Sequence, residues 1–247
     1  LCRPGGARAG RLRLLMDKAT VQRLVTLNET FYSHFAAPFA ASRAGPQPGY
    51  ERLLAYVPVG RPRVLDVGCG DGRFGRYLRA AGRDVDYAGV DFSAALLAAC
   101  AVPGRFAQRD LSQPGGLDGL GYFDLIVCLS TLQHIPGRHN RARVLAEMAA
   151  CLAAGGHIAL ANWQFLSSER QRRKIRPWAE AGLQASDVET GDYLLAWQRG
   201  GEGRRYVALV DEEETRRLAE SAQLRVVELF RSDGREGDLN LYALLAG

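Results

Sequence analysis

The sequence predicts an α/β fold with a mostly parallel, doubly wound sheet of seven strands. From about residue 61 onward, short β-rich apolar runs alternate with Ala- and Leu-rich helical patterns. This alternation is typical of βαβ units whose helices cover both faces of a parallel sheet. A glycine-rich turn follows the first of these runs directly, and the alternation breaks after Ala161. We therefore predict an insertion after the fifth strand.

The expected elements follow in chain order. Apolar residues at helical spacing predict an N-terminal helix over 17–39, which the Pro- and Gly-rich segment 44–49 closes. The strands are expected at Val64–Val67, Val85–Val90, Arg105–Gln108, Tyr122–Cys128, His157–Ala161, Leu224–Phe230 and Leu239–Leu245. The intervening helices are expected at Gly72–Ala81, Ser93–Ala101, Asn140–Leu152 and Asp211–Ser221, the last with Asp211 as its N-cap. This divides the chain into an extension (1–16), a helical cap (17–60) and a main domain (61–247) with an insertion or lid over about 162–205.

Composition excludes several classes of protein. The 247 residues are 47% hydrophobic and 24% charged, as in a globular chain with one core. No apolar run approaches the ~18 residues of a membrane-spanning helix, so we expect no membrane partner. All but two of the basic residues behind the net charge of +5 are arginine, which we interpret as compositional bias before nucleic-acid affinity. The five cysteines are odd in number and widely spaced, which favours a reducing, cytoplasmic setting without a metal site.

The first fifteen residues are rich in Arg and Gly and lack the apolar core of a secretory signal. We expect this extension to be disordered or non-native, with Met16 as the natural start.

The glycine-rich turn carries the strongest functional signal. Gly68, Gly70 and Gly72 follow the buried run directly, so a ligand could approach the backbone amides at the start of the next helix. The alternative is a generic βα turn whose glycines serve helix packing. Asp66, inside the strand, suits a cationic amino-acid group better than a pyrophosphate, which argues against NAD.

Two further carboxylates follow the next two strands. Asp91 ends the second strand, where it could accept hydrogen bonds from both hydroxyls of an adenosine ribose. Asp110, directly after the third strand, could accept from an adenine amino group. For each of them, a role in a helix N-cap or turn is the alternative.

Over residues 61–156, this order of motifs resembles the class I S-adenosylmethionine-dependent methyltransferases. The strand Phe123–Cys128, the loop Leu129–Pro136 and the turn Ala153–Gly156 are similar to further landmarks of that family. The resemblance implies a Rossmann-like fold, S-adenosylmethionine as cofactor and S-adenosylhomocysteine as product. The cofactor-binding residues would then be Tyr32, Arg43, Asp66, Gly68, Cys69, Gly70, Asp91, Phe92, Ser93, Asp110, Leu111 and Leu129.

The segment 32–43 and several later residues are similar to the tRNA wobble-uridine carboxymethyl methyltransferases. The likeness implies that Tyr32 and Arg43 contact the methionine end of the cofactor, with Arg43 pairing its carboxylate. It also implies a substrate side formed by Gln133, Trp163, Gln164, Trp197, Arg205 and Tyr206. The sequence departs from that family where Val207 and Ala208 replace a usual tyrosine and histidine. Both tRNA and a small molecule therefore stay open as methyl acceptors, as does an activating partner subunit.

His134 is the candidate general base, because it follows the fourth strand at the edge where such folds bind ligands. Its alternative is a helix-entry residue bonded to backbone.

The side chains of Trp163, Trp197 and Tyr206 could stack on a base or only pack. The basic run 170–176 could grip phosphates or form a solvated helix face. Two functions follow: an active methyltransferase, or a non-catalytic protein that binds adenosylmethionine.

Overall fold

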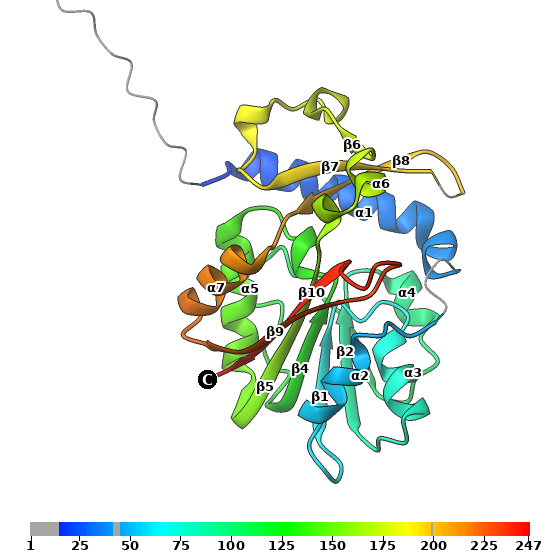
Figure 1. Cartoon of the computed structure of the whole chain (residues 1–247), viewed down its shortest axis with the longest axis vertical. Helices are drawn as coiled ribbons and strands as arrows, with labels where there is room; N and C mark the ends of the chain where they lie inside the picture. The colour runs from blue at the N-terminus through cyan, green and yellow to red at the C-terminus, as the bar shows by residue number, and fades with distance from the viewer. Residues whose placement is uncertain (1–14, 42–44, 199) are drawn as a thin grey trace, which may run out of the picture.

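The computed structural model describes residues 15–41, 45–198 and 200–247. The main strands are β1 Arg63–Val67, β2 Asp86–Asp91, β3 Arg105–Gln108, β4 Phe123–Leu129, β5 Leu152–Trp163, β9 Arg225–Ser232 and β10 Asn240–Ala246. They form one sheet in the order β3-β2-β1-β4-β5-β10-β9 (Figure 1). The first five are parallel, and β10 is antiparallel to both β5 and β9. This confirms the predicted fold class.

The helices of the described residues are α1 Lys18–Ala41, α2 Tyr50–Leu53, α3 Arg73–Ala80, α4 Ala94–Ala98, α5 Arg138–Ala150, α6 Glu169–Arg172 and α7 Glu212–Ser221. Five of these seven helices lie close to predicted positions, with α4 shorter than expected, while α2 and α6 were not predicted. Asp211 caps α7 as predicted, since its side chain accepts a hydrogen bond from the Glu214 amide at 2.9 Å. Strand β5 is longer than predicted because it pairs with β4 from Leu152 and with β10 as far as Trp163. The glycines at 155 and 156, which indicated a turn, lie inside this strand.

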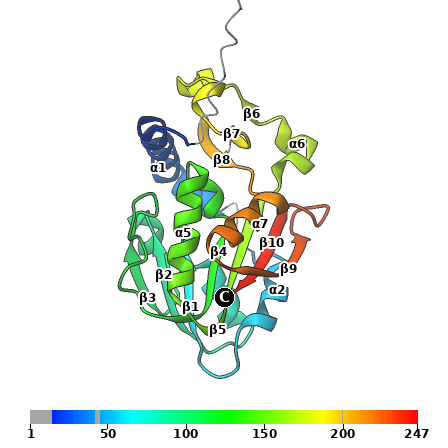
Figure 2. The same cartoon turned by 90° about the vertical axis from the view of Figure 1, so that its left-hand side faces the viewer.

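Both faces of the sheet are buried. On one face, Leu65 and Val67 pack in a core with Val144 of α5 and Leu218 of α7. On the other face, Val64 packs in a second core with residues of α2 and α3. Because successive strand residues point to opposite faces, a strand covered on both sides is apolar at nearly every position. Figure 1 shows α5 and α7 on one side of the sheet and α3 on the other, and in Figure 2 α5 and α7 lie in front of the strands.

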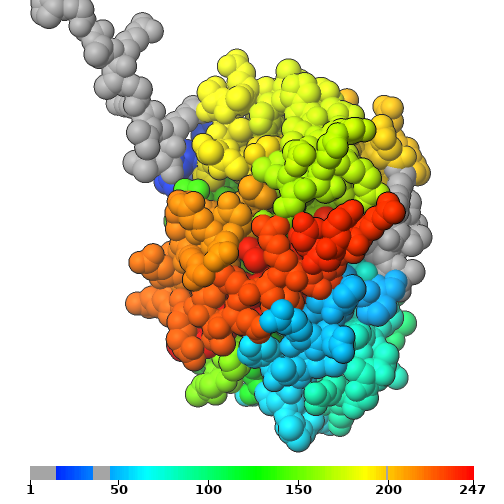
Figure 3. Space-filling model, viewed as in Figure 1, coloured from blue at the N-terminus to red at the C-terminus, as the bar shows by residue number. Residues whose placement is uncertain are grey.

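The predicted insertion forms a small antiparallel sheet. Its strands are β6 Ile175–Arg176, β7 Asp192–Trp197 and β8 Gly203–Ala208, in the order β6-β7-β8. Strand β8 packs on α1, and both lie above the end of the large sheet at which β1 and β4 finish (Figure 1). The space-filling view shows the insertion as a continuous mass over this end (Figure 3). Helix α1 and the insertion therefore cover the edge where ligands of parallel sheets bind.

Short 3₁₀ turns complete the chain: η1 Leu54–Tyr56, η2 Leu132–His134, η3 Phe165–Ser167, η4 Trp178–Ala181 and η5 Ala185–Asp187. None of the helices in the described ranges is long and apolar enough to span a membrane. Nor do the described residues contain a group of three His, Cys, Asp or Glu side chains arranged to hold a metal.

Candidate active site

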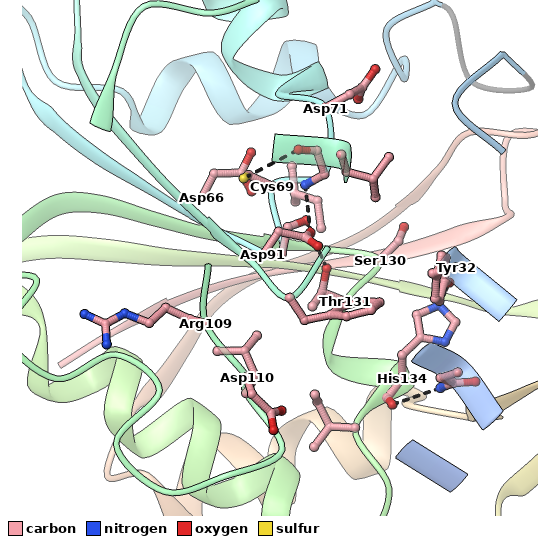
Figure 4. Close-up of a pocket in the computed structure, with 18 of the residues that line it drawn as sticks. Tyr32, Asp66, Cys69, Asp71, Asp91, Arg109, Asp110, Ser130, Thr131 and His134 are labelled. Carbon is pink, nitrogen blue, oxygen red and sulfur yellow. Dashed lines mark hydrogen bonds between the residues drawn. The ribbon is translucent and has the colours of Figure 1, made fainter. Parts of the chain in front are cut away.

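A single pocket at the carboxyl edge collects most of the predicted cofactor residues (Figure 4). Of the twelve, ten line it: Tyr32, Asp66, Gly68, Cys69, Gly70, Asp91, Phe92, Asp110, Leu111 and Leu129. Ser93 stands just behind the lining as the N-cap of α4, its hydroxyl accepting a hydrogen bond from the Leu96 amide. Arg43 lies outside the described residues. The pocket therefore joins the ends of three adjacent strands, β1, β2 and β3.

The turn after β1 is tight. The prediction that a ligand could approach its backbone amides is wrong for Gly68, Cys69 and Gly70, whose N–H groups have partners within the protein. The Gly68 and Cys69 N–H groups both donate to the Val90 carbonyl, at 2.7 and 3.0 Å. The Gly70 N–H donates to the Asp91 carboxylate at 2.9 Å. Gly68 has φ +77°, and a Cβ there would lie 2.1 Å from the Thr131 hydroxyl oxygen. The glycine thus permits a close approach of two loops, and what the turn offers a ligand is space rather than these N–H donors.

Asp91 is held in a fixed orientation at the end of β2. One carboxylate oxygen accepts from the Gly70 amide and the other from the Ser93 amide, each at 2.9 Å. Burial raises the pKa of this carboxyl, while the backbone hydrogen bonds act in the opposite direction. Each oxygen of a carboxylate can accept more than one hydrogen bond, so acceptor capacity for two hydroxyl groups remains.

We expect Asp91→Ala to weaken S-adenosylmethionine binding by about 1–3 kcal/mol, because charge-assisted hydrogen bonds to the ribose are lost. Titration calorimetry of the purified variant measures this loss. Asp86→Ala is the matched control, since Asp86 begins the same strand at its far end and pairs with Arg105 on the surface. Unchanged affinity in Asp91→Ala would contradict the placement of the ribose.

Asp66 lies at the base of the pocket and is 3% exposed. Burial raises its pKa to about 7, although the Tyr87 hydroxyl donates a hydrogen bond to the carboxylate and opposes the shift. A cation placed against this carboxylate would favour its ionised form. Asp66 is therefore suited to hold an ammonium group.

Helix α1 contributes residues that the sequence analysis missed. Val25, Asn28 and Glu29 line the pocket together with Tyr32. Their spacing of three and four residues places them on one face of the helix, which was the only available signal. Burial and the nearby charge of Asp110 raise the pKa of Glu29.

His134 lines the side of the pocket opposite Arg109, beside Tyr32 (Figure 4). Its Nε2 lies 2.9 Å from the Tyr32 hydroxyl, and its Nδ1 lies 3.1 Å from the Tyr206 carbonyl oxygen. One ring nitrogen is thus bonded to backbone, as the structural alternative expects, while the other faces a pocket residue and the role of general base stays a prediction.

The predicted substrate residues do not line this pocket. Tyr206 is fully buried, and its hydroxyl donates to Asp192 at 2.7 Å. The buried Gln164 amide donates to the Val210 carbonyl at 2.9 Å. The Gln133 side chain, also buried, accepts from the Trp163 amide. The structure thus places all three inside the packing between insertion and sheet, which corrects the expectation of direct substrate contact.

The remaining predicted substrate residues, which lie on β5, β7 and β8, pack together beside helix α1. The Arg205 guanidinium lies over the rings of Trp163 and Trp197, at 4.9 and 5.5 Å from their centroids. It also lies 5.3 Å from the Phe31 ring of α1. This cation–π cluster joins β8 to the N-terminal helix. A sequence pattern of aromatic and basic residues does not by itself separate such packing from recognition of a base.

A buried ion network connects the insertion to the main domain. The guanidinium of Arg141 on α5 is 3% exposed and donates to the Tyr206 hydroxyl at 3.0 Å. It also lies 3.4 Å from both Glu189 of the insertion and Glu214 of α7, and 3.9 Å from Asp192 of β7. Burial raises the pKa of Asp192 to about 6, and the Arg141 charge opposes this shift. Glu214 has a second cationic partner, since the Arg138 Nε donates to its carboxylate at 2.8 Å, whereas Arg141 forms the ion pairs of Glu189 and Asp192 among the described residues.

Fold and site together define a class I S-adenosylmethionine-dependent methyltransferase domain: the strand order with its antiparallel β10, the glycine turn, and carboxylates at successive strand ends. A family model described as "Methyltransferase domain" matches residues 32–229. The chain belongs to this family of methyltransferase domains.

Relatives within the family are diverse. The chain is 33% identical over 179 residues to a biotin biosynthesis bifunctional protein BioCD from Bordetella avium, covering 71% of this chain and 36% of that protein. It is 32% identical over 118 residues to a tRNA U34 carboxymethyltransferase from a Geobacter species, covering 45% of this chain and 35% of that protein. The chain thus spans about a third of the length of these two relatives.

A solved structure of similar fold is a SAM-dependent methyltransferase from Methanosarcina mazei. The TM-score is 0.61 at 17% identity, covering 78% of this chain and 95% of that one. At this identity the likeness concerns the fold.

Proposed function

We propose that this chain transfers a methyl group from S-adenosylmethionine to a small-molecule acceptor. The observation that carries the proposal is the series Asp66, Asp91 and Asp110, which lies at or near the carboxyl ends of three adjacent parallel strands around one pocket. Asp66 would hold the ammonium group of the methionine part, Asp91 the ribose hydroxyls and Asp110 the adenine amino group. The donor and acceptor types therefore fit the cofactor.

When bound, S-adenosylmethionine would supply an electrophilic methyl group on a sulfonium. The chain's own task is then to align the acceptor and to exclude water, and no protein nucleophile is required. Helix α1 supports this task because Val25 and Tyr32 form part of the pocket lining while the insertion covers the helix.

The lining of the pocket favours a small, partly apolar acceptor. Val25, Leu111, Ile135 and Pro136 provide an apolar surface beside the polar cofactor residues. The Trp163, Trp197 and Arg205 side chains, which could have stacked on an RNA base, are occupied with one another. Both observations support a small acceptor over a polynucleotide.

One feature favours tRNA as a second candidate acceptor. Arg170, Arg172 and Arg173 are exposed on α6 and directly after it. Glu169 neutralises part of this charge because it forms an ion pair with Arg173. Glu180, the other acidic residue near this run in the sequence, forms its ion pair with Arg204 instead. Such a group of arginines could contact phosphates in a salt-dependent manner.

The decisive experiment has two steps. Titration calorimetry compares S-adenosylmethionine with NAD, and radiolabelled methyl transfer is then measured into bulk tRNA and into a small-metabolite extract. We expect binding of S-adenosylmethionine alone, with label in metabolites. Label in tRNA that disappears in Arg170→Glu/Arg172→Glu would establish the second candidate instead.

Two other outcomes contradict the proposal. Tight S-adenosylmethionine binding without transfer to either pool would indicate a non-catalytic binding protein. Absence of S-adenosylmethionine binding would refute the assignment of the pocket, and Asp91→Ala serves as the binding-deficient reference in both steps.

A further inference from the structure

The hydrogen-bond partners of His134 determine which of its nitrogens carries the proton. Nδ1 faces the Tyr206 carbonyl oxygen at 3.1 Å. A carbonyl oxygen only accepts, so Nδ1 must be the protonated nitrogen. Nε2 faces the Tyr32 hydroxyl at 2.9 Å and the Gln133 amide nitrogen at 3.4 Å.

Gln133 determines the protonation state of His134 Nε2. Its side-chain oxygen accepts from the Trp163 backbone N–H, so its nitrogen is the atom directed at His134 and can only donate. Two donors therefore point at Nε2, which must be the unprotonated, basic nitrogen of a neutral imidazole. In this resting state the Tyr32 hydroxyl donates a hydrogen bond to Nε2.

The pair is held rigidly at the pocket wall. Asn28, which is 6% exposed, donates to the His134 carbonyl oxygen at 3.2 Å and accepts from the Tyr206 amide at 2.8 Å. The Tyr32 ring packs edge-on against Phe92, the residue after Asp91, with centroids 6.0 Å apart. Tyr32 thus contacts both Phe92 and His134, and Figure 4 shows Tyr32 and His134 next to each other at the wall of the pocket.

We propose that Tyr32 and His134 form a proton relay for a hydroxyl acceptor, an inference that rests on the proposed methyl transfer. The acceptor O–H gives its proton to the Tyr32 oxygen while the Tyr32 proton passes to His134 Nε2. The acceptor oxygen forms the new bond to the methyl carbon, and the carbon–sulfur bond breaks with its electron pair remaining on sulfur. The proton released by the reaction ends on His134, whose Nδ1–H stays bonded to the Tyr206 carbonyl.

The relay also selects a class of acceptor. A carboxylate needs no base, whereas a phenol-type hydroxyl must lose its proton as it is methylated. A phenol and the Tyr32 side chain carry the same functional group, so the proton passes between two chemically similar oxygens. An aromatic hydroxyl compound also suits the apolar lining formed by Val25, Leu111 and Ile135. The inferred acceptor is therefore an aryl or enolic alcohol.

The first test examines the relay without requiring turnover. The chain has four histidines, and His134→Asn assigns the His134 signals in a nitrogen-15 spectrum of histidine-labelled protein. At pH 8 we expect a protonated Nδ1 and an unprotonated Nε2, with the Nε2 signal shifting in Tyr32→Phe. A proton on Nε2, or an Nε2 signal that ignores Tyr32→Phe, would overturn the relay.

The second test compares methylation of two probe acceptors by wild type and Tyr32→Phe. With unsubstituted phenol, protonated at pH 8, we expect the variant to lose about 10²–10⁴-fold in rate, the usual contribution of general acid–base catalysis. With a nitrophenol that is already ionised at pH 8, we expect a much smaller loss than with phenol, because no proton must be moved and only the contacts of the Tyr32 hydroxyl with the pocket are lost. Tyr56→Phe, which removes a hydroxyl bonded to Glu228 outside the pocket, is the matched control.

The outcomes separate the two levels of inference. Equal losses with both probes would mean that Tyr32 only shapes the pocket and would overturn the relay. Wild-type protein that binds S-adenosylmethionine and labels metabolites but neither phenol would overturn the acceptor class. Wild-type protein that does not bind S-adenosylmethionine in calorimetry would overturn the proposed function itself, while the spectrum still decides the Tyr32–His134 arrangement.

Discussion

Asp66→Asn is expected to stabilise the ligand-free protein at pH 8 and at the same time to weaken its binding of S-adenosylmethionine. The carboxyl is 3% exposed, and burial raises its pKa from 3.8 to about 7. Holding it ionised in the folded state therefore costs free energy, by up to about 4 kcal/mol at ~1.36 kcal/mol per pKa unit. The asparagine carries no charge and still accepts a hydrogen bond from Tyr87.

The sign of the pH dependence follows from the raised pKa. Below pH 3.8 the carboxyl is protonated in both the folded and the unfolded chain, so wild type and variant have similar stability. As the pH rises from 3.8 to about 7, the unfolded chain ionises first and wild type loses stability. Above about pH 7 the deficit is constant. Denaturant unfolding of both proteins at pH 5 and pH 8 measures it.

The matched control is Asp71→Asn, on the turn that follows the strand of Asp66. The Asp71 side chain is 28% exposed and pairs with Arg76 at 2.8 Å, so its removal should change stability by less than about 1 kcal/mol. An Asp66→Asn variant that is less stable than wild type at pH 8 would contradict the prediction, because it would mean that the ionised carboxylate stabilises the empty pocket.

Cofactor binding supplies the second half of the prediction. An ammonium group next to Asp66 favours the ionised form, so binding at pH 7 should release about half a proton from this carboxyl. Calorimetry in two buffers of different ionisation enthalpy measures the release. In Asp66→Asn we expect no such release and an affinity lower by about 1.5–3 kcal/mol. Equal proton release in both proteins would assign the titration to another group.

Arg141→Ala is the second change with a large expected effect. It removes the guanidinium that forms the ion pairs of Glu189 and Asp192, both largely buried, among the described residues, whereas Glu214 keeps its ion pair with Arg138. Leaving buried acidic groups without their cation typically costs about 3–5 kcal/mol. We expect the free energy of unfolding to fall by this amount at pH 8.

The loss should depend on pH. The pKa of Asp192 is about 6 with Arg141 present, and without the cation it must rise further. At pH 5 a protonated Asp192 needs no partner, so Arg141→Ala should be less destabilising there than at pH 8. Arg216→Ala is the control, since Arg216 forms an exposed pair with Glu212 on α7 that is worth at most about 0.5 kcal/mol. A loss that is the same at both pH values would contradict the role of the acidic groups.

The network also links the insertion to the site. Arg141 bonds the Tyr206 hydroxyl, and the carbonyl of the same residue holds His134 Nδ1. A displaced β8 would therefore release the histidine. For this reason Arg141→Ala should alter the His134 signals in the nitrogen-15 spectrum, although the two side chains have no direct contact among the described hydrogen bonds.

Much of the sheet and of the cofactor side could be predicted from sequence because the signals are local. A strand buried on both faces is a short apolar run, and a glycine turn must directly follow the strand that it terminates. Asp66, Asp91 and Asp110 occur at strand ends, and parallel strands bring those ends to one edge. The order of residues along the chain was therefore sufficient to predict the fold class and the three carboxylates that line the pocket.

Only the tertiary structure decided whether the predicted substrate residues contact a ligand or pack within the protein. Trp163, Trp197, Arg205 and Tyr206 have the composition of a recognition surface, yet contacts with residues distant in sequence occupy them. The role of His134 likewise depends on partners more than 70 residues away, such as Tyr206 and Tyr32. Residue type and spacing determine local conformation and burial, whereas the partner of a polar side chain is set by long-range packing, which this sequence alone does not encode in any local pattern.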